Sequence, residues 1–339
     1  MLLRRLLALA LAVGLVLGAM QVRERFFGTN PAGSAAPDDL RVACAAELGA
    51  VCEALDTASP ALVEQATTTV QRFGDPELPF DVWLTIAPWP DLAADARVRS
   101  GQDAAERRSD VLARSPVVIA AQRSRVEVIE ATCEGAVSWR CLAEHADTPW
   151  AELGGESGWG RVKVGLDHPA ERAGGLLALA QATASYFEGA SYNTRSLGSA
   201  DFFAWVSDLA AATGPGSGQS PFERMLLTGA ADYEFVGALE AGAVPLLARS
   251  PGRAEQITVL RPDPVVTADV VAVGYGDAAQ AAVEQVVEQV AQPLADNGWR
   301  VPGGERPSEL EPIELPDDNG VPSAPTLEAL RQTWDEVTS

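Results

Sequence analysis

Residues 162–175 read VKVGLDHPAERAGG, an apolar run that breaks at a polar corner and leads into a second apolar segment. The apolar run at 161–166 predicts a buried strand, and the segment at 169–187 predicts a helix. Asp167 is a favoured helix N-cap residue, and Pro169 suits the first helical positions. The stretch therefore predicts a strand-to-helix turn in which Asp167 accepts backbone N–H bonds.

Two roles suit this corner, and the residues leave both open. It could only cap the helix, or it could also contact a ligand. Helix N-termini at the carboxyl ends of parallel strands attract anions in α/β proteins. His168 and Arg172 are the side chains placed for ligand contact, and Gly174-Gly175 permits close packing of the helix on its strand.

The same alternation of strand and helix patterns runs along the rest of the chain. Apolar runs predict strands at 40–45, 80–86, 115–122, 126–132, 256–260 and 269–275. Periodic patterns predict helices at 59–73, 199–212, 221–241, 276–298 and 326–337. Strands that are apolar along their whole length are typical of parallel sheets covered by helices. The prediction is an α/β fold with parallel-rich sheets.

The overall charge limits the classes of partner. The 339 residues carry 25 Lys and Arg against 47 Asp and Glu, a formal net charge of −22. Nucleic acid and anionic lipid surfaces repel such a chain, so the folded part is not expected to bind either.

The N-terminus has the pattern of an export signal. Arg4 and Arg5 precede an uncharged run at 6–21, which is short for a membrane-spanning helix. A cleaved signal peptide and an uncleaved membrane anchor both fit residues 1–26, and residues 27–39 read as a Pro/Gly/Ser linker. Either alternative places the remainder outside the cytoplasm, secreted or membrane-anchored.

Four cysteines in an exported chain predict two disulfides. Three connectivities exist, and the two spacings of eight residues favour Cys44–Cys52 and Cys133–Cys141. No His lies near enough to either pair for a zinc-binding pattern, so no metal site is expected.

Catalytic motifs are incomplete or missing from the sequence. GESGWG at 155–160 comes near G-x-S-x-G, but Trp159 stands where the second Gly is required. No P-loop, no G-x-G-x-x-G after a strand and no H-E-x-x-H occurs. The second of the two histidines, His145, lies in a helical pattern. Neither an enzymatic activity nor a cofactor is therefore expected.

The order of these segments resembles that of extracytoplasmic solute-binding proteins of the type-2 periplasmic binding fold, the receptor family of ABC transporters. The resemblance covers residues 40–300 and is carried by LRVACAAEL, FDVWLTIAPWPDL, LARSPVVIAAQRSR, VKVGLDHPAERAGGLLAL and TGAADYEFVGALEAGA. It implies two lobes joined by two crossing strands that act as a hinge. Lobe one would comprise 40–114 plus 256–300, lobe two 115–255, and an acidic Pro-rich tail with a docked helix 301–339.

A closer resemblance is to actinobacterial membrane proteins that join such a domain to a von Willebrand factor A domain. In those proteins a Pro-rich acidic stretch and a Trp-bearing helix, similar to residues 302–337, precede the second domain. The D-x-S-x-S metal motif of that second domain does not occur in this chain. The helix is predicted to dock through Leu327, Leu330 and Trp334.

The resemblance also implies a small-molecule site in the cleft between the lobes, served by a membrane permease or another envelope protein. Loops at the carboxyl ends of strands would supply the contacts. The residues expected there are Glu47, Trp89, Ser115, Asp167, His168, Arg172 and Tyr233. Because Glu47 opposes negative charge and could take an amine, a carboxylate or amide ligand suits this set better than a bare oxyanion.

The sequence also allows a second function, that of a scaffold or sensor. The first loop reads Cys44-Ala45-Ala46-Glu47 and lacks the Ser or Thr pair that cradles oxyanions in molybdate-type receptors. Solute capture could therefore have been lost, leaving a scaffold or sensor that binds other proteins. Converging aromatic and polar groups in the cleft would indicate a receptor, and a filled or closed cleft would indicate a scaffold.

Overall fold

The computed structural model describes residues 39–57, 59–75, 77–102, 106–133, 135–189, 191–213 and 219–339. The expected signal or anchor at 1–26, and all of the 27–39 linker except its last residue, lie outside these ranges. No helix in the described ranges is both long enough and apolar enough to cross a membrane.

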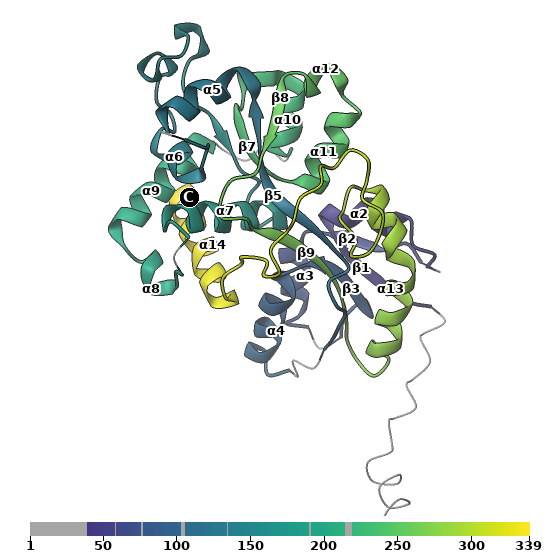
Figure 1. Cartoon of the computed structure of the whole chain (residues 1–339). Helices are drawn as coiled ribbons and strands as arrows, with labels where there is room; N and C mark the ends of the chain where they lie inside the picture. Colours follow the sequence, from purple (N-terminus) through teal and green to yellow (C-terminus); the bar gives the residue numbers. More distant parts are fainter. Residues whose placement is uncertain are drawn as a thin grey trace, which may run out of the picture.

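The chain folds into two lobes that share one continuous path of strands (Figure 1). The strands are β1 (Val42–Ala45), β2 (Leu62–Glu64), β3 (Val82–Ile86), β4 (Arg107–Arg108), β5 (Ala113–Gln122), β6 (Val164–Gly165), β7 (Phe235–Leu239), β8 (Ile257–Leu260) and β9 (Thr267–Gly274). Their order is β2-β1-β3-β9-β5-β7-β6, with β4 paired to β9 and β8 paired to β5. The architecture is thus the expected two-lobed α/β fold.

Strand β5 crosses from one lobe to the other. Its first residues, 113–116, pair with β9 of lobe one, and its later residues pair with β7 and β8 of lobe two. Residues 257–260, expected in lobe one, therefore belong to lobe two, because β8 pairs with the second half of β5. The chain returns to lobe one through residues 261–266, where the Val117 N–H donates to the Val266 carbonyl (2.8 Å). All pairs made by β5 and β9 are antiparallel, and the parallel pairs lie at β1–β2, β1–β3 and β6–β7. The sheet is therefore more mixed than the apolar strands alone predict.

Helices cover both lobes. Lobe one carries α2 (Gly49–Glu53), α3 (Ala66–Arg72), α4 (Trp89–Arg99) and α13 (Ala279–Asp296). Lobe two carries α5 (Arg123–Thr132), α6 (Trp139–Glu144), α7 (Ala173–Tyr186), α8 (Thr194–Leu197), α9 (Ala200–Thr213), α10 (Pro221–Thr228), α11 (Glu240–Ala248) and α12 (Pro251–Ala254). Helix α14 (Ala324–Thr338) follows the tail, and short 3₁₀ turns lie at η1 (Ala46–Leu48), η2 (Trp150–Leu153), η3 (Ser157–Trp159) and η4 (Gly229–Ala231).

Three predicted elements were wrong, each because tertiary pairing or helical periodicity prevails over the local pattern. The first part of 59–73 forms edge strand β2, since it pairs in parallel with β1. Residues 126–132 belong to helix α5, whose Val126 and Ile129 are buried at helical spacing. Segment 221–241 contains helix α10, Gly229 with a positive φ that ends it, and strand β7.

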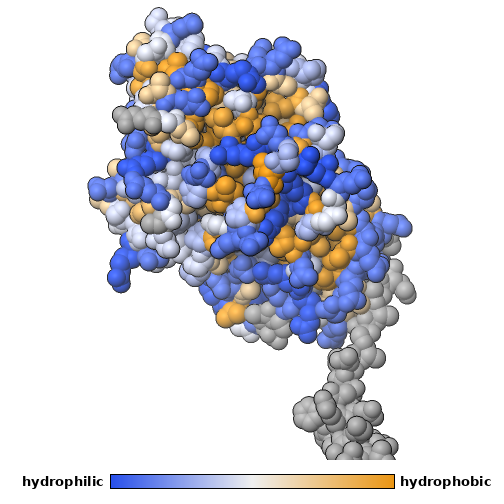
Figure 2. All heavy atoms as spheres, in the orientation of Figure 1, coloured by the Kyte–Doolittle hydropathy of each residue, from blue (hydrophilic) through white to orange (hydrophobic). Residues whose placement is uncertain are grey.

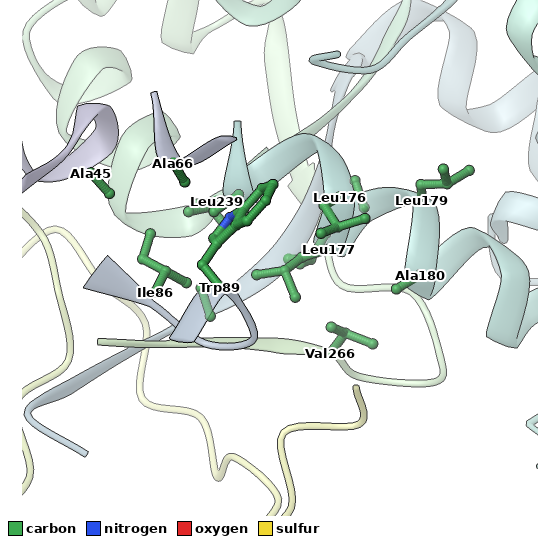
Figure 3. Packing of buried hydrophobic residues seen from close by; sticks show 14 of the residues in the cluster. Ala45, Ala66, Ile86, Trp89, Leu176, Leu177, Leu179, Ala180, Leu239 and Val266 are labelled. Carbon is green, nitrogen blue, oxygen red and sulfur yellow. The ribbon is translucent and has the colours of Figure 1, made fainter. Parts of the chain in front are cut away.

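One hydrophobic core runs through both lobes, and Trp89 lies inside it (Figure 3). Trp89 is 1% exposed, and its indole packs among Ile86 of lobe one, Leu176 and Leu177 of α7, and Leu239 of β7. The lobes are therefore joined by packed side chains as well as by the crossing strands.

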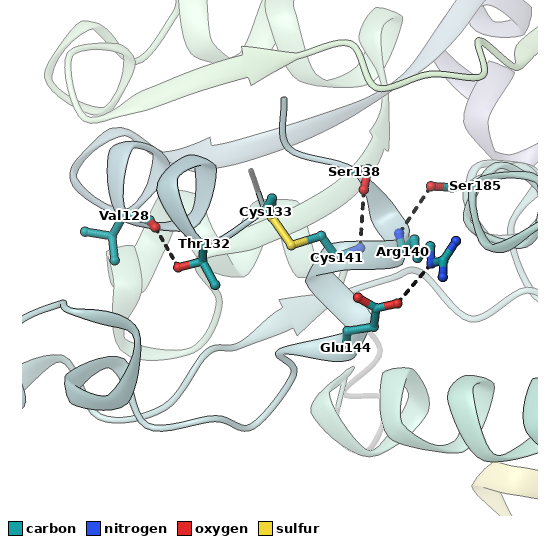
Figure 4. Close-up of a disulfide and its surroundings, with 8 residues drawn as sticks. All are labelled: Val128, Thr132, Cys133, Ser138, Arg140, Cys141, Glu144 and Ser185. Carbon is teal, nitrogen blue, oxygen red and sulfur yellow. Dashed lines mark hydrogen bonds and ion pairs between the residues drawn. A yellow bond between two sulfur atoms is a disulfide. The ribbon is translucent and has the colours of Figure 1, made fainter. Parts of the chain in front are cut away.

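Both predicted disulfides are confirmed. Cys44–Cys52 joins the end of β1 to α2, with Cα atoms 6.6 Å apart. Cys133–Cys141 joins the end of α5 to α6, with Cα atoms 5.8 Å apart, beside the N-cap of α6 (Figure 4). The first disulfide closes the loop that contains η1, and Glu47 lies at the middle of that turn.

The tail crosses the hinge before it reaches α14. The Arg114 guanidinium donates to the carbonyls of Pro316 (2.8 Å) and Asp317 (2.9 Å), and the Thr267 N–H donates to the Asn319 carbonyl (3.0 Å). The face in Figure 2 is mostly hydrophilic and carries hydrophobic patches, some of them near the middle of the molecule.

Helix α14 contacts α7, α8 and α9 of lobe two and α4 of lobe one, so it spans the two lobes. The predicted docking face is confirmed, because Leu327 and Leu330 are fully buried and Trp334 is 2% exposed.

Truncating Trp334 tests this docking. We expect Trp334→Ala to lower the free energy of unfolding by about 3–5 kcal/mol, the usual cost of removing a buried aromatic side chain. Glu336→Ala, on the exposed side of the same helix, should stay within about 0.5 kcal/mol of the wild type. Denaturant unfolding measures both, and equal stability of the two variants would contradict the docked helix.

The two disulfides offer a matched pair, since each closes a loop of the same sequence separation, eight residues. Replacing either pair by alanine should cost a similar amount of stability, about 2–4 kcal/mol. Only Cys44→Ala/Cys52→Ala should also speed hydrogen exchange at the start of α7, because this loop holds Glu47. Unchanged exchange at the start of α7 in Cys44→Ala/Cys52→Ala would show that the disulfide-closed loop does not support the contact between the lobes that is described below.

Candidate functional site

A cavity of about 970 Å³ lies between the two lobes and the end of α14. Its walls come from three parts of the chain. Lobe one contributes Val63, Glu64 and Gln65, lobe two contributes Asp167, His168, Glu171, Arg172 and Tyr233, and α14 contributes Trp334, Val337 and Thr338. Carboxylates, a guanidinium, an imidazole and aromatic rings therefore converge on one space.

The corner at 167–172 differs from the predicted cap. The N–H groups of Glu171 and Arg172 donate to the His168 carbonyl (2.9 and 3.1 Å), which makes a turn, and α7 begins at Ala173 and not at 169. The Asp167 carboxylate lies 3.6 Å from the Arg172 guanidinium, and no hydrogen bond from it caps the helix. The capping role of Asp167 was thus wrong, because the turn separates Asp167 from the first helical amides.

Of the two glycines predicted to allow close packing, only Gly175 is required, because a Cβ on Gly174 would be in ordinary contact with Leu239 at 3.4 Å. A Cβ on Gly175 would lie 2.2 Å from the Asp167 carbonyl oxygen, a contact that no side chain tolerates. Glycine at this position lets α7 pack directly against the corner.

The acceptor at the start of α7 comes from the other lobe. Glu47 Oε1 accepts a hydrogen bond of 2.6 Å from the Ala173 N–H. Glu47 is half-buried as a residue, but its Oε2 is shielded from solvent and has no hydrogen-bond partner. Burial raises the pKa of Glu47, and the Ala173 amide and the Arg172 charge oppose that rise.

A second cavity of about 410 Å³ lies on the other side of this contact. It shares Ala46, Asp167 and Arg172 with the larger cavity and is also lined by Glu47 and Gly174. The space between the lobes is therefore divided where Glu47 meets the start of α7.

Asp167 is the titrating group between the two cavities. Burial raises its pKa from the ordinary value of 3.8 to about 6; Arg172 opposes this rise, and Glu47, Glu223 and Glu171 add to it. Around pH 6 this carboxyl group is therefore partly protonated. In that range it can both accept and donate hydrogen bonds.

Five of the seven expected residues meet at these cavities, and two do not. Glu47, Asp167, His168, Arg172 and Tyr233 line one or both cavities. Trp89 lies in the core, and Ser115 is buried in β5, where its Oγ accepts from the Ala241 N–H (3.0 Å) at the start of α11.

The sequence did not identify the walls that lobe one and the C-terminus supply. Glu64 and Gln65 were expected inside a helix, so no strand end was predicted to present them to the cleft. Trp334 was expected to dock, but an amphipathic pattern does not tell which surface it covers. Within the described residues, no group of three or more His, Cys, Asp or Glu side chains could hold a metal ion.

Asp167→Asn tests the raised pKa. A carboxyl group with a raised pKa in the folded protein adds stability that is complete below pH 3.8 and is lost as the pH rises through about 6. The wild type should therefore lose stability relative to Asp167→Asn, on the order of 2 kcal/mol, as the pH rises through that window. Urea unfolding of both proteins at several pH values measures the difference, and a difference independent of pH would contradict the burial of this carboxyl group.

Comparisons by sequence alone assign no relatives, since no family model matches the chain and no curated protein matches it. Solved structures do match the fold. AfuA from Actinobacillus pleuropneumoniae, a periplasmic binding protein with exogenous fructose-6-phosphate bound, is 12% identical with a TM-score of 0.57, over 88% of this chain and 98% of that chain.

Two further structures have the same architecture. Apo FutA2 from Synechocystis PCC6803 is 12% identical with a TM-score of 0.54, over 88% of this chain and 96% of that chain. A ferric binding protein from Campylobacter jejuni is 10% identical with a TM-score of 0.53, over the same shares of both chains. Identities this low show a shared fold, and the fold of this chain is that of the two-lobed periplasmic binding proteins.

Proposed function

We propose that this chain is an extracytoplasmic solute-binding protein that takes a small molecule into the cavity between its lobes. The observation that carries the proposal is the convergence of polar and aromatic groups from both lobes on a space of about 970 Å³. Pockets for small ligands reach this size, and polar groups in them fix the orientation of the ligand. A membrane permease of the ABC type is the partner that this function requires.

The charges on the cavity walls favour a cationic group on the solute. Asp167 and Glu171 face a single lining arginine, Arg172, while Glu64 is neutralised by Arg72 at 2.8 Å. An ammonium group would be attracted to this excess of carboxylate, and a bare oxyanion would be repelled. Amino acids, short peptides and other small amines are therefore the proposed class.

A scaffold without solute is the second candidate, and two observations favour it. Trp89 fills the space near the hinge, and Glu47 already bridges the lobes. The polar cavity that remains beside this contact is the reason to place the solute-binding function first.

A thermal-shift screen of amino acids, short peptides, diamines, sugars and oxyanions tests the function. A true solute at a hundredfold excess over its Kd adds about 2.7 kcal/mol of stability and raises the melting temperature. The screen pairs each amine with its N-acetylated analogue, which keeps the shape and removes the charge. The amines should stabilise the protein and the acetylated forms should not.

Variants then place the ligand in the cavity. Glu171→Gln should weaken binding of the hit in calorimetry, whereas Glu53→Gln, an exposed carboxylate on α2 that does not line the cavity, should bind as the wild type does. No stabilisation by any compound would contradict solute binding and favour the scaffold.

A further inference from the structure

We propose that the Glu47 carboxylate takes the place at the start of α7 where a helix N-terminus would otherwise bind a free anion. The hydrogen bond from the Ala173 N–H to Glu47, called the latch below, holds the two lobes together and keeps free anions out of the cleft. This inference deepens the proposed function by naming the group that fills part of the cleft. The latch itself can be tested without any solute.

The start of α7 needs an acceptor that its own sequence does not supply. The first amides of a helix have no partner inside the helix and carry partial positive charge. Arg172 is the N-cap residue and makes no side-chain capping bond, and Ala173 to Ser185 are all buried. Water therefore has little access to these amides, and a carboxylate from outside the helix is the group that satisfies them.

Glu47 fits that role by distance and by anchoring. Its Oε1 lies 2.6 Å from the Ala173 nitrogen, the short distance expected of a charge-assisted hydrogen bond. The turn that carries it is fixed between β1 and α2 by the Cys44–Cys52 disulfide. The carboxylate thus approaches α7 from a braced loop of the opposite lobe.

Only one of the two carboxylate oxygens of Glu47 forms a hydrogen bond to α7. Glu47 Oε2 is buried without a hydrogen-bond partner, and the smaller cavity is lined by Glu47 itself. Because Oε2 is shielded from solvent, it stays without a partner, and a free anion that entered the cavity would meet the Glu47 charge at close range. The latch therefore sets the sign of charge that the cleft accepts.

Chemical rescue tests the latch. Glu47→Ala removes the carboxylate and leaves the Ala173 N–H without its acceptor, so the melting temperature should fall. Acetate or formate should then restore it, at concentrations at least about tenfold lower than any that affect the wild type. Sodium chloride at the same ionic strength is the control for salt effects.

Two variants sharpen the result. Glu171→Ala removes a nearby carboxylate that makes no bond to α7 in this structure, so acetate should not rescue it. Ala173→Pro removes the donor, and it is made only together with Glu47→Ala, because its ring Cδ would otherwise lie where Glu47 Oε1 accepts the bond. Proline is tolerated at the first helical position, and Arg172 before it already has the extended backbone that proline requires (φ −131°, ψ 137°). Glu47→Ala/Ala173→Pro should show no response to acetate, because the N–H that acetate would occupy is gone.

The double variant therefore shows whether acetate acts at the Ala173 amide. An acetate response that persists in the double variant, or one that is equal in wild type and Glu47→Ala, would overturn the latch. Should Glu47→Ala fail to fold, Glu47→Gln takes its place, since it keeps the shape of the side chain and removes the charge. A melting temperature of Glu47→Gln equal to that of the wild type would show that the charge plays no part.

The two proposals fail separately. A wild type that binds no compound in the solute screen, while acetate rescues Glu47→Ala, rejects solute binding and keeps the latch. A wild type that binds an amine, while acetate rescues nothing, rejects the latch and keeps solute binding.

Discussion

The buried N-terminus of α7 sets the relation between the two lobes. Its first amides face the interior between the lobes and need an acceptor there, because an unpaired buried N–H costs about 1–3 kcal/mol. The Glu47 carboxylate provides the acceptor from lobe one. Any separation of the lobes at this point breaks that bond. The closed arrangement of the lobes and the capping of α7 therefore depend on the same hydrogen bond.

The remainder of α7 ties the same helix to the hinge. Gln181 is fully buried; it accepts from the Trp139 indole N–H (2.8 Å) and donates to the Pro264 carbonyl (3.0 Å) in the returning segment. Leu176 and Leu177 pack against Trp89, and α14 lies along the same helix. One buried helix therefore contacts the latch, the hinge and the C-terminal helix, and the solute cavity is the space that these contacts leave.

The sequence predicted the fold class, both disulfides and the docking face of α14, because each depends on local patterns: apolar runs, equal cysteine spacings and the periodicity of Leu327, Leu330 and Trp334. The resemblance to periplasmic binding proteins also implied a cleft lined by seven residues, of which five line the cavities and two, Trp89 and Ser115, are buried elsewhere. The sequence missed the capping partner of α7. Asp167 has the local sequence of an N-cap, but the bond comes from Glu47, which is 126 residues away along the chain. Such contacts follow from how the lobes pack, which no window of sequence contains.

Hydrogen exchange of the Ala173 amide, followed by NMR, tests this account most directly, because that amide is the donor in the interlobe bond. In the wild type it should be protected to a degree similar to that of the amides inside α7. In Glu47→Ala the protection of this amide should fall sharply, while amides in the middle of α7 keep theirs. An Ala173 amide that exchanges at the same rate in both proteins would contradict the claim that Glu47 closes the cleft.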